Sequence, residues 1–113
     1  MNPHTPEDRL RTLSNDKDFE VRIGVTKNPR IPLEIQEELA RSKDKYIRWS
    51  LANNIHASPK VLDLLADDDD TYVRAHVAKN PSASEDTLRK LASDREIYVR
   101  DSLSKNTKKI PII

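Results

Sequence analysis

Four consecutive aspartates, Asp67 to Asp70, form the densest group of potential metal ligands in this sequence of 113 residues. A calcium loop of the EF-hand type needs a glycine at its sharp turn and a closing bidentate glutamate, and neither follows this run. We therefore interpret the run as a solvated loop in which Asp70 opens a helix. His4 and His56 are too far apart to chelate one ion, and His76 is isolated on the flank of its predicted helix. We predict no metal site.

The sequence contains no cysteine and a single glycine, Gly24. Without cysteine, the chain forms no disulfide, no thiolate zinc site, no iron–sulfur cluster and no cysteine nucleophile. A single glycine excludes the glycine-rich loops that hold phosphates in nucleotide enzymes. No grouping of serine, histidine and aspartate stands out either. We therefore predict a protein without cofactors and without enzyme activity.

The charges are almost balanced, with 20 basic and 19 acidic residues and a net charge of +1. This balance argues against a dedicated nucleic-acid or membrane-surface binder, because both usually carry a basic excess. The longest apolar stretch, residues 110–113, is far too short to span a bilayer. The first residues are polar and show no signal peptide. We expect a cytoplasmic protein without a membrane partner.

The elements that position all these residues follow from a repeat with a period of 26 residues. Arginine recurs at positions 22, 48, 74 and 100, and asparagine recurs at positions 2, 28, 54, 80 and 106. Leucine recurs at positions 13, 39, 65 and 91, and tyrosine at positions 46, 72 and 98. We call each such set of equivalent positions a column. Repeats of this length without insertions indicate a solenoid, in which each unit buries its apolar face against its neighbours. We predict one repeat domain over residues 1–113, with units 2–27, 28–53, 54–79 and 80–105 and a partial unit or C-terminal cap at 106–113.

Each unit opens with a short first helix. In the third unit, Leu62, Leu65 and Ala66 have the i, i+3, i+4 spacing of an amphipathic helix. Ser58 and Pro59 mark its start, because a hydroxyl caps free N–H groups and proline fits the first helical turn. The segment is only about ten residues long, so a tighter 3₁₀ turn is an alternative.

A second helix follows in each unit. Val73 and Val77 have i, i+4 spacing, and the carboxylate of Asp70 suits the positive helix end. The helix should end near Asn80 and Pro81, since asparagine tolerates the left-handed conformation and the residue before proline avoids the helical region. The sequence therefore predicts an all-α fold of helix–turn–helix units.

The segment from Asp69 to Asp94 carries Asp-x-x-Tyr-Val-Arg-x-x-Val-Ala-x-Asn-Pro and then Leu-x-x-Leu-Ala-x-Asp, and degraded copies recur along the chain. This pattern resembles the leucine-rich repeat variant family. The resemblance implies a right-handed solenoid of alternating α and 3₁₀ helices, similar to HEAT repeats, with protein binding as its function. The founding type of that family carries a cysteine cluster for an iron–sulfur centre, which this chain cannot form. The resemblance thus implies a fold and no chemistry.

The arginine column lies at the edge of the predicted buried stripe, with an aspartate six residues earlier in three units. We predict that these arginines and carboxylates form a structural ladder between the loops of neighbouring units, because guanidinium and carboxylate pair well. An anion-binding stripe is the alternative. We interpret the asparagine column as a turn device. The predicted structural ladder comprises Arg22, Arg48, Arg74, Arg100, Asp16, Asp68, Asp94, Asn28, Asn54, Asn80 and Asn106.

With Val73 and Val77 inward, positions 75 and 79 of the second helix should point away from the core. The column of position 75 holds Ile23, Trp49, Ala75 and Asp101. The column of position 79 holds Lys27, Asn53, Lys79 and Lys105. Aromatic side chains beside lysines are typical of a peptide-binding face. We predict partner contacts at Trp49, Ile23, Lys27, Tyr72 and Lys79. The alternative is that Trp49 and the tyrosines pack between units.

We therefore predict a non-enzymatic repeat scaffold that binds another protein, or an acidic peptide, through the exposed face of the second helices. The alternative is a nucleic-acid-binding HEAT-like module, which the lysine column favours and the 19 acidic residues oppose. A lyase or chaperone of the phycobilisome HEAT type is a third possibility. Residues 110–113 should fold back over the last helices or dock on a second copy, so we expect a monomer or a weak dimer through the C-terminal end.

Overall fold

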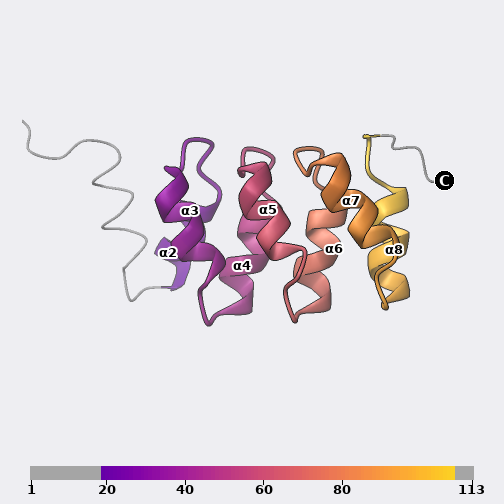
Figure 1. Ribbon diagram of the computed structural model, residues 1–113. Helices are drawn as coiled ribbons and strands as arrows, with labels where there is room; N and C mark the ends of the chain where they lie inside the picture. The colour runs from indigo at the N-terminus through magenta and orange to yellow at the C-terminus, as the bar shows by residue number, and fades with distance from the viewer. Residues whose placement is uncertain (1–18, 109–113) are drawn as a thin grey trace, which may run out of the picture.

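The computed structural model describes residues 19–108, which form seven α-helices and no strand (Figure 1). In chain order these helices are α2 (Phe19–Thr26), α3 (Leu33–Ala40), α4 (Lys45–Ala52), α5 (Pro59–Leu65), α6 (Thr71–Lys79), α7 (Glu85–Ala92) and α8 (Ile97–Ser104). The predicted all-α class is confirmed for this part of the chain.

The first helix of each unit is short but α-helical. The helices α3, α5 and α7 each contain seven or eight residues, so the alternative of a 3₁₀ turn is wrong for these three segments. Side-chain caps help two of these short helices to form: the Ser58 hydroxyl accepts a hydrogen bond from the backbone N–H of Lys60 in α5, and the Ser84 hydroxyl accepts one from that of Thr87 in α7. Each cap satisfies an N–H group that the helix itself leaves free. The helix α3 begins after Pro32 without a side-chain cap.

The second helices α4 and α6 begin at aspartate caps, and α6 ends before a proline. The carboxylates of Asp44 and Asp70 accept hydrogen bonds from the first turns of α4 and α6. At the end of α6, Asn80 has φ −79° and ψ 120°, which is extended backbone. The expected left-handed asparagine is therefore wrong here. The helix ends instead because Pro81 pushes its predecessor out of the helical region.

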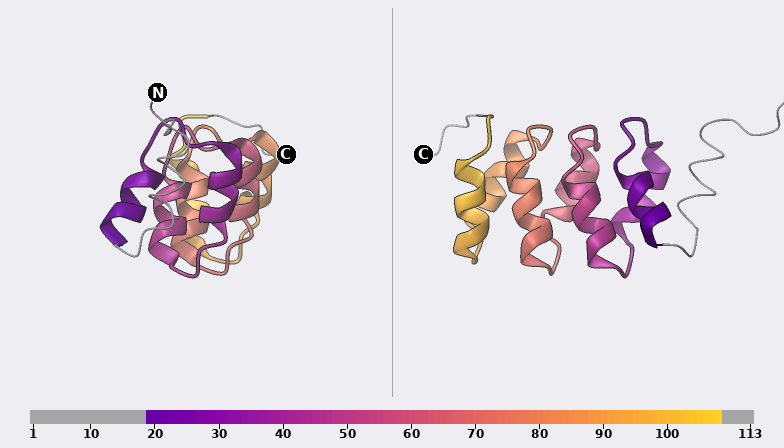
Figure 2. Two further views of the ribbon diagram at one scale, coloured as in Figure 1. Left: turned by 90° about the vertical axis from the view of Figure 1, so that its left-hand side faces the viewer. Right: turned by 180° about the vertical axis from the view of Figure 1, so that it is seen from behind.

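The helices form two layers. Along one layer α2 packs against α4, α4 against α6, and α6 against α8, while α3 packs against α5 in the other. Figure 1 shows α3, α5 and α7 in front of this row, and Figure 2 shows the row from behind. Each first helix also contacts the second helix that follows it in the chain. As a result, α4 and α6 are covered on several sides by their neighbours.

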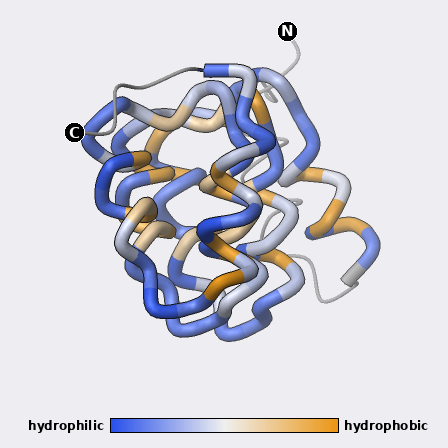
Figure 3. The backbone as a smooth tube through the Cα atoms, turned by 90° about the vertical axis from the view of Figure 1, so that its right-hand side faces the viewer, coloured by the Kyte–Doolittle hydropathy of each residue, from blue (hydrophilic) through white to orange (hydrophobic). Residues whose placement is uncertain are grey.

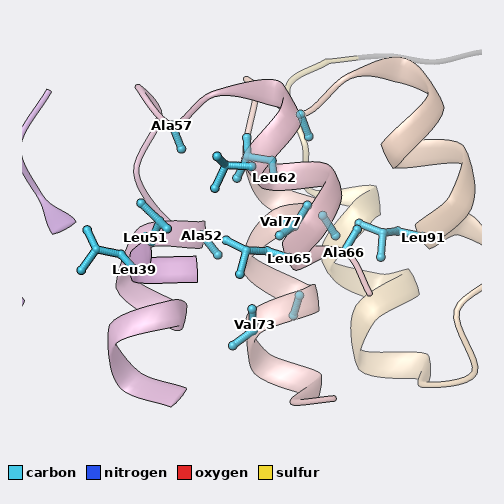
Figure 4. Close-up of a cluster of buried hydrophobic side chains, with 14 of the residues drawn as sticks. Leu39, Leu51, Ala52, Ala57, Leu62, Leu65, Ala66, Val73, Val77 and Leu91 are labelled. Atoms are coloured by element: carbon cyan, nitrogen blue, oxygen red, sulfur yellow. The ribbon is translucent and has the colours of Figure 1, made fainter. Parts of the chain in front are cut away.

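The core lies between the two layers and follows the sequence columns. Leu39, Leu65 and Leu91 are buried, as are Ile47, Val73 and Val99. Figure 4 shows these leucines meeting apolar side chains of α4, α5 and α6. Coloured by hydropathy, the chain alternates between apolar and hydrophilic stretches along its helices (Figure 3). A helix with one apolar stripe gains stability from packing against a neighbour rather than from its own propensity.

Two predictions concern residues outside 19–108. The first is that Asp16 belongs to the structural ladder, and the second is that the apolar segment 110–113 folds back over the last helices or docks on a second copy. None of the helices between residues 19 and 108 combines the length and apolar character that crossing a bilayer requires.

Candidate functional site

Two arginines join consecutive repeat units. Arg48 places its Nε atom 2.8 Å from an Asp68 carboxylate oxygen and donates from Nη1 to the carbonyl of Ser42. Arg74 places its Nε atom 2.9 Å from Asp94 and donates from Nη1 to the carbonyl of Asp68. In both cases the carboxylate belongs to the following unit and the carbonyl to the arginine's own unit. Each guanidinium therefore clamps two inter-helix loops together.

Electrostatics favour the charged form of these pairs. Burial alone would raise the pKa of the Asp94 carboxyl group, but hydrogen bonds from Arg74 and the backbone N–H of Glu96, with the charges of Arg74 and Arg95, lower it overall. The hydrogen bond to Asp68 raises the pKa of Arg48. Since their guanidinium groups already bind carboxylates, Arg48 and Arg74 are not placed to form an anion-binding stripe.

The two outer arginines of the column differ from this pattern. Arg22 is half-buried, and the position that would supply its carboxylate is Ser42. Arg100 is exposed and donates from Nη1 to the carbonyl of Asp94, but no carboxylate lies against it within residues 19–108. Within residues 19–108, the clamp is complete at Arg48 and Arg74, where the following unit supplies an aspartate.

The asparagine column forms a second ladder. The side-chain amide of Asn80 donates to the carbonyls of Ala52 and Asn54, and its oxygen accepts from the N–H of Ser82. Asn54 and Asn106 repeat the same pattern one unit earlier and one unit later. These amides saturate buried carbonyls between units, so they hold the stack together and offer no site for chemistry.

A hollow of about 530 Å³ opens on the layer of second helices. Its walls come from α2, α4 and α6, and the lining is mostly apolar and aromatic. The lining residues are Ile23, Lys27, Tyr46, Trp49, Ser50, Asn53 and His76. Hollows of this size, with apolar walls and a few polar groups, are typical of binding sites.

Trp49 is the centre of an aromatic cluster at this hollow. Its ring centroid lies 5.8 Å from that of Tyr46 and 6.0 Å from that of Tyr72. The His76 ring is closer, at 5.0 Å. Tyr72 in turn meets Tyr98 edge-on at 5.3 Å, so the rings follow one another from α4 to α8. Tilted contacts at these distances are favourable for aromatic pairs.

Two polar atoms of this cluster are buried without a partner. Among residues 19–108, only Trp49 Nε1 and His76 Nδ1 are buried side-chain nitrogen or oxygen atoms without a hydrogen bond. Burial, together with the charge of Lys79, lowers the pKa of His76 to about 4, so its ring is neutral at pH 7. Buried unpaired polar groups cost stability and are uncommon in native proteins. Both occur on the wall of the same hollow.

Two lysines, Lys27 and Lys79, flank the cluster. Lys27 lines the hollow, and Lys79 lies near enough to His76 to affect its pKa. Neither forms an ion pair within residues 19–108, whereas Lys105, in the same column, pairs with Asp101 at 3.4 Å. The hollow therefore combines an apolar wall with two lysines that form no ion pair with any described carboxylate.

A second hollow of about 460 Å³ adjoins the first. The two share Lys27, Ser50 and Asn53, and the second continues to Ile55 and His56 in the loop after α4. Ile55 is 56% exposed, so the second hollow offers an apolar side chain to solvent. We call the two hollows together the Trp49 groove.

One comparison with known proteins bears on this architecture. Residues 72–96, which span most of α6 and all of α7, match the family model described as leucine rich repeat variant. This segment therefore resembles a leucine rich repeat variant unit. No curated protein and no solved structure matches the chain significantly.

The matched segment contains two of the predicted partner-binding residues, Tyr72 and Lys79. The structure brings Ile23, Lys27 and Trp49 together around the first hollow, and Tyr72 borders it through its contact with Trp49. The side chains of Ile23 and Trp49 also pack against the core while remaining partly exposed. The Trp49 ring therefore packs against the core and also lines the hollow, and its contact with a partner stays a prediction.

Ala75 contradicts the expected orientation of its column. We expected position 75 to point away from the core, but Ala75 is only 1% exposed. The reason is that α6 packs against α4 on one side and α8 on the other, so little of its surface remains free. The outer face of the second helices is therefore narrower than helical periodicity alone predicts.

Sequence reasoning missed His76, which it treated as isolated on its helix. The column of His76 otherwise holds small residues, Gly24, Ser50 and Ser102, while Ala75 is the small member of the Trp49 column. In the sequence, this exchange of a large for a small residue between adjacent units could have indicated that His76 lies near Trp49. It lets the His76 ring lie against the Trp49 ring of the preceding unit.

The aspartate run and the histidines were the candidate metal ligands of the sequence. No group of three or more histidine, aspartate or glutamate side chains that could hold an ion occurs in the part of the chain between residues 19 and 108. Three aspartates of the run make other contacts. Asp68 binds Arg48, Asp70 caps α6, and a carboxylate oxygen of Asp67 lies 3.2 Å from Nζ of Lys90.

Proposed function

We propose that this protein is a non-enzymatic repeat scaffold, a right-handed α-solenoid of about four 26-residue units in one domain. The support is that the same inter-unit bonds recur with the same spacing: arginine to the carboxylate 20 positions later, and asparagine to the carbonyls 28 and 26 positions earlier. The leucine rich repeat variant match covers about one such unit. Repeats of that family are non-catalytic and generally serve protein interaction, which supports a scaffold role.

The function supported best is the binding of a peptide segment of another protein in the Trp49 groove. The observation that carries this proposal is the apolar hollow at Trp49 with Lys27 and Lys79 beside it, neither paired with a carboxylate among the described residues. An uncompensated charge next to an apolar cavity favours a ligand that supplies both an apolar group and the opposite charge. The expected partner of this protein is therefore an acidic segment that carries a large apolar side chain.

The arrangement suggests how such a segment would bind. Its apolar side chain would fill the hollow against Trp49 and the neutral His76 ring, where burial of apolar area supplies most of the affinity. Its carboxylates would approach Lys27 and Lys79. The chain would continue into the second hollow toward Ile55, since Lys27, Ser50 and Asn53 border both.

Selection from a library of displayed peptides, followed by titration of Trp49 fluorescence, tests this proposal. We expect the selected peptides to combine acidic residues with a leucine or an aromatic residue. Trp49→Ala should weaken their binding by about 2 kcal/mol, or roughly 30-fold. Since Trp49 also packs on the core, Lys27→Glu and Lys79→Glu provide surface variants, with Lys60→Glu on the first-helix layer as matched control.

Two results would contradict the proposal. One is selected peptides that bind the wild-type protein, Trp49→Ala and Lys27→Glu equally well, which would place the site elsewhere. The other is a short DNA duplex that binds more tightly than any selected peptide and loses affinity steeply as the salt concentration rises. That result would favour the nucleic-acid-binding module instead.

A further inference from the structure

The second helices meet one another through two columns of the repeat. The first column holds Ile23, Trp49, Ala75 and Asp101. The second column holds Gly24, Ser50, His76 and Ser102. Where α4 packs against α6, the earlier helix contributes Trp49 and the later helix contributes His76. By the same register, the contact of α2 with α4 pairs Ile23 with Ser50, and the contact of α6 with α8 pairs Ala75 with Ser102.

Between α4 and α6, both members of the pair are rings. The ring centroids of Trp49 and His76 lie 5.0 Å apart, and the ring planes are inclined at 47°. One nitrogen atom of each ring, Nε1 of Trp49 and Nδ1 of His76, is buried. The His76 ring thus occupies the space next to the tryptophan of the preceding unit.

Between α6 and α8, both members of the pair are small. Ala75 is 1% exposed and Ser102 is 2% exposed. Among the described helices, these two form the most extensive contact. Since the distance between packed helices depends on the side chains at their contact, small residues allow a close approach. Here the helices themselves close the contact.

Between α2 and α4, a large member of the pair faces a small one. Ile23 and Ser50 both line the hollow of about 530 Å³, together with Trp49. The hydroxyl oxygens of Ser50 and Thr26 lie 2.5 Å apart, and this contact joins the two helices. Because Ser50 supplies no ring, the space that His76 occupies one unit later stays open at this contact.

The walls of this hollow are suited to a ring. Tyr46, Trp49 and His76 contribute three rings to its lining. Aromatic pairs are favourable when their centroids lie about 4.5–7 Å apart, and Trp49 already makes such contacts with Tyr46 and His76. An aromatic side chain that enters the hollow can therefore gain ring contacts that an aliphatic side chain of similar volume cannot make.

We infer that the hollow between α2 and α4 receives one aromatic side chain of the bound segment, in the position that His76 occupies one unit later. This inference rests on the proposed binding of an acidic peptide segment, and it specifies the apolar residue of that segment. The ring would lie over Ser50 and against Ile23 and Trp49. Lys27, which lines the same hollow, would meet a carboxylate next to the ring in the ligand. The ligand should therefore carry phenylalanine, tyrosine or tryptophan rather than leucine at this position.

A pair of peptides tests the choice of a ring over an aliphatic side chain. The probe is the tightest acidic peptide selected on the wild-type protein, and its partner is a copy in which leucine replaces the aromatic residue. Isothermal titration calorimetry measures both affinities. We expect the leucine copy to bind about five- to tenfold more weakly, because it loses the ring contacts. This comparison requires no variant of the protein.

A second test fills the hollow from within the protein. Ser50→His repeats on α4 the side chain that α6 carries at His76, so the added ring should compete with the ligand and weaken the aromatic peptide about tenfold or more. The matched control is Ser50→Ala, which removes the hydroxyl contact with Thr26 and leaves the hollow open. It should bind the peptide like the wild-type protein. Circular dichroism shows whether both variants are folded.

The outcomes distinguish this inference from the proposed function. A leucine copy that binds as tightly as the aromatic peptide would overturn the inference, and so would a folded Ser50→His variant that binds as tightly as Ser50→Ala. Selected peptides that contain leucine and no aromatic residue would overturn it as well. In these three cases the proposed peptide binding stands. If no acidic peptide can be selected on the wild-type protein, the proposed function fails, and this inference fails with it.

Discussion

Arg74 and Asp94 are joined across the boundary between two repeat units by two N–O contacts, Nε to Oδ2 at 2.9 Å and Nη2 to Oδ1 at 3.4 Å. Both side chains are nearly buried, and the third donor of the guanidinium, Nη1, binds the carbonyl of Asp68. A single side chain therefore fixes the loops before α6 and before α8 relative to each other. Such a pair is favourable because geometry and extra hydrogen bonds offset the cost of desolvating two charges.

Arg74→Ala should lower the free energy of unfolding by about 2–4 kcal/mol, because it leaves the buried carboxylate of Asp94 unpaired. The measurement is urea denaturation followed by circular dichroism. Arg100→Ala is the matched control from the same column, and with no carboxylate partner among the described residues it should cost about 0.5 kcal/mol or less, as should Arg30→Ala on the surface. Equal effects of Arg74→Ala and Arg100→Ala would show that the clamp does not stabilise the stack.

Asp94 predicts how this stabilisation depends on pH. Its pKa is lower in the folded protein than the ordinary aspartate value of about 3.9, although burial opposes the lowering. A lowered folded pKa gives stability that is present above the unfolded pKa and is lost as the pH falls through the folded pKa. Asp94→Asn should therefore be less stable than wild type at pH 7, and the difference in denaturation midpoint should shrink below about pH 4. A difference that stays constant from pH 7 to the acid range would contradict this account.

The sequence columns predicted the helices and the core well. Period-26 spacing and i, i+4 valines fix which residues are apolar on one side of a helix, and Ile47, Val73 and Val99 are buried as expected. The carboxylate partner of each arginine was harder to assign. Asp68 lies six positions before Arg74 in the sequence, yet it contributes its carbonyl to Arg74 and its carboxylate to Arg48. Only the stacking of units decides between those two arginines.

In the candidate site, too, some residues could be placed from the sequence and others could not. Ile23, Lys27 and Trp49 could be grouped from their columns because equivalent positions of a repeat line up on one surface. His76 and Ala75 could not be placed, because their environments depend on how closely α6 approaches α4 and α8. Helical periodicity describes one helix at a time, whereas a side chain in a packed layer is covered by three or four helices.

Asn80 offers a test of the asparagine ladder. It is 3% exposed, and Asn80→Ala would leave the carbonyls of Ala52 and Asn54 and the N–H of Ser82 without their side-chain partner. We expect a loss of about 2–4 kcal/mol in the free energy of unfolding, since each buried unsatisfied group costs about 1–3 kcal/mol. Asn80→Asp should cost at least as much, because a carboxylate cannot donate to carbonyls.

Asn53 is the control for this ladder, because it is exposed and lies outside the asparagine column. Asn53→Ala should change the free energy of unfolding by about 0.5 kcal/mol or less. Urea denaturation of the three variants side by side gives the comparison. If Asn53→Ala and Asn80→Ala had the same effect, the ladder would be a by-product of stacking with no stabilising role.

Trp49 can report directly on the protonation of His76. It is the single tryptophan of the sequence, and its ring lies 5.0 Å from the His76 ring. Burial lowers the pKa of His76 to about 4, with a further contribution from Lys79. An imidazolium charge against the indole face changes its electrostatic environment. The fluorescence of Trp49 should therefore change with a midpoint near pH 4, well below the ordinary histidine value of about 6.5.

The same titration has a consequence for stability. Because the folded pKa of His76 lies below the unfolded one, the unfolded state binds more protons between about pH 6.5 and pH 4, and stability falls as the pH is lowered through that window. We expect a loss of about 1–2 kcal/mol, less than the full shift implies, because the half-buried ring stays partly screened by solvent. His76→Phe keeps a ring against Trp49 and removes the titration, so it should abolish both the change in fluorescence and this loss. A change in Trp49 fluorescence that persists with the same midpoint in His76→Phe would assign the titration to another group.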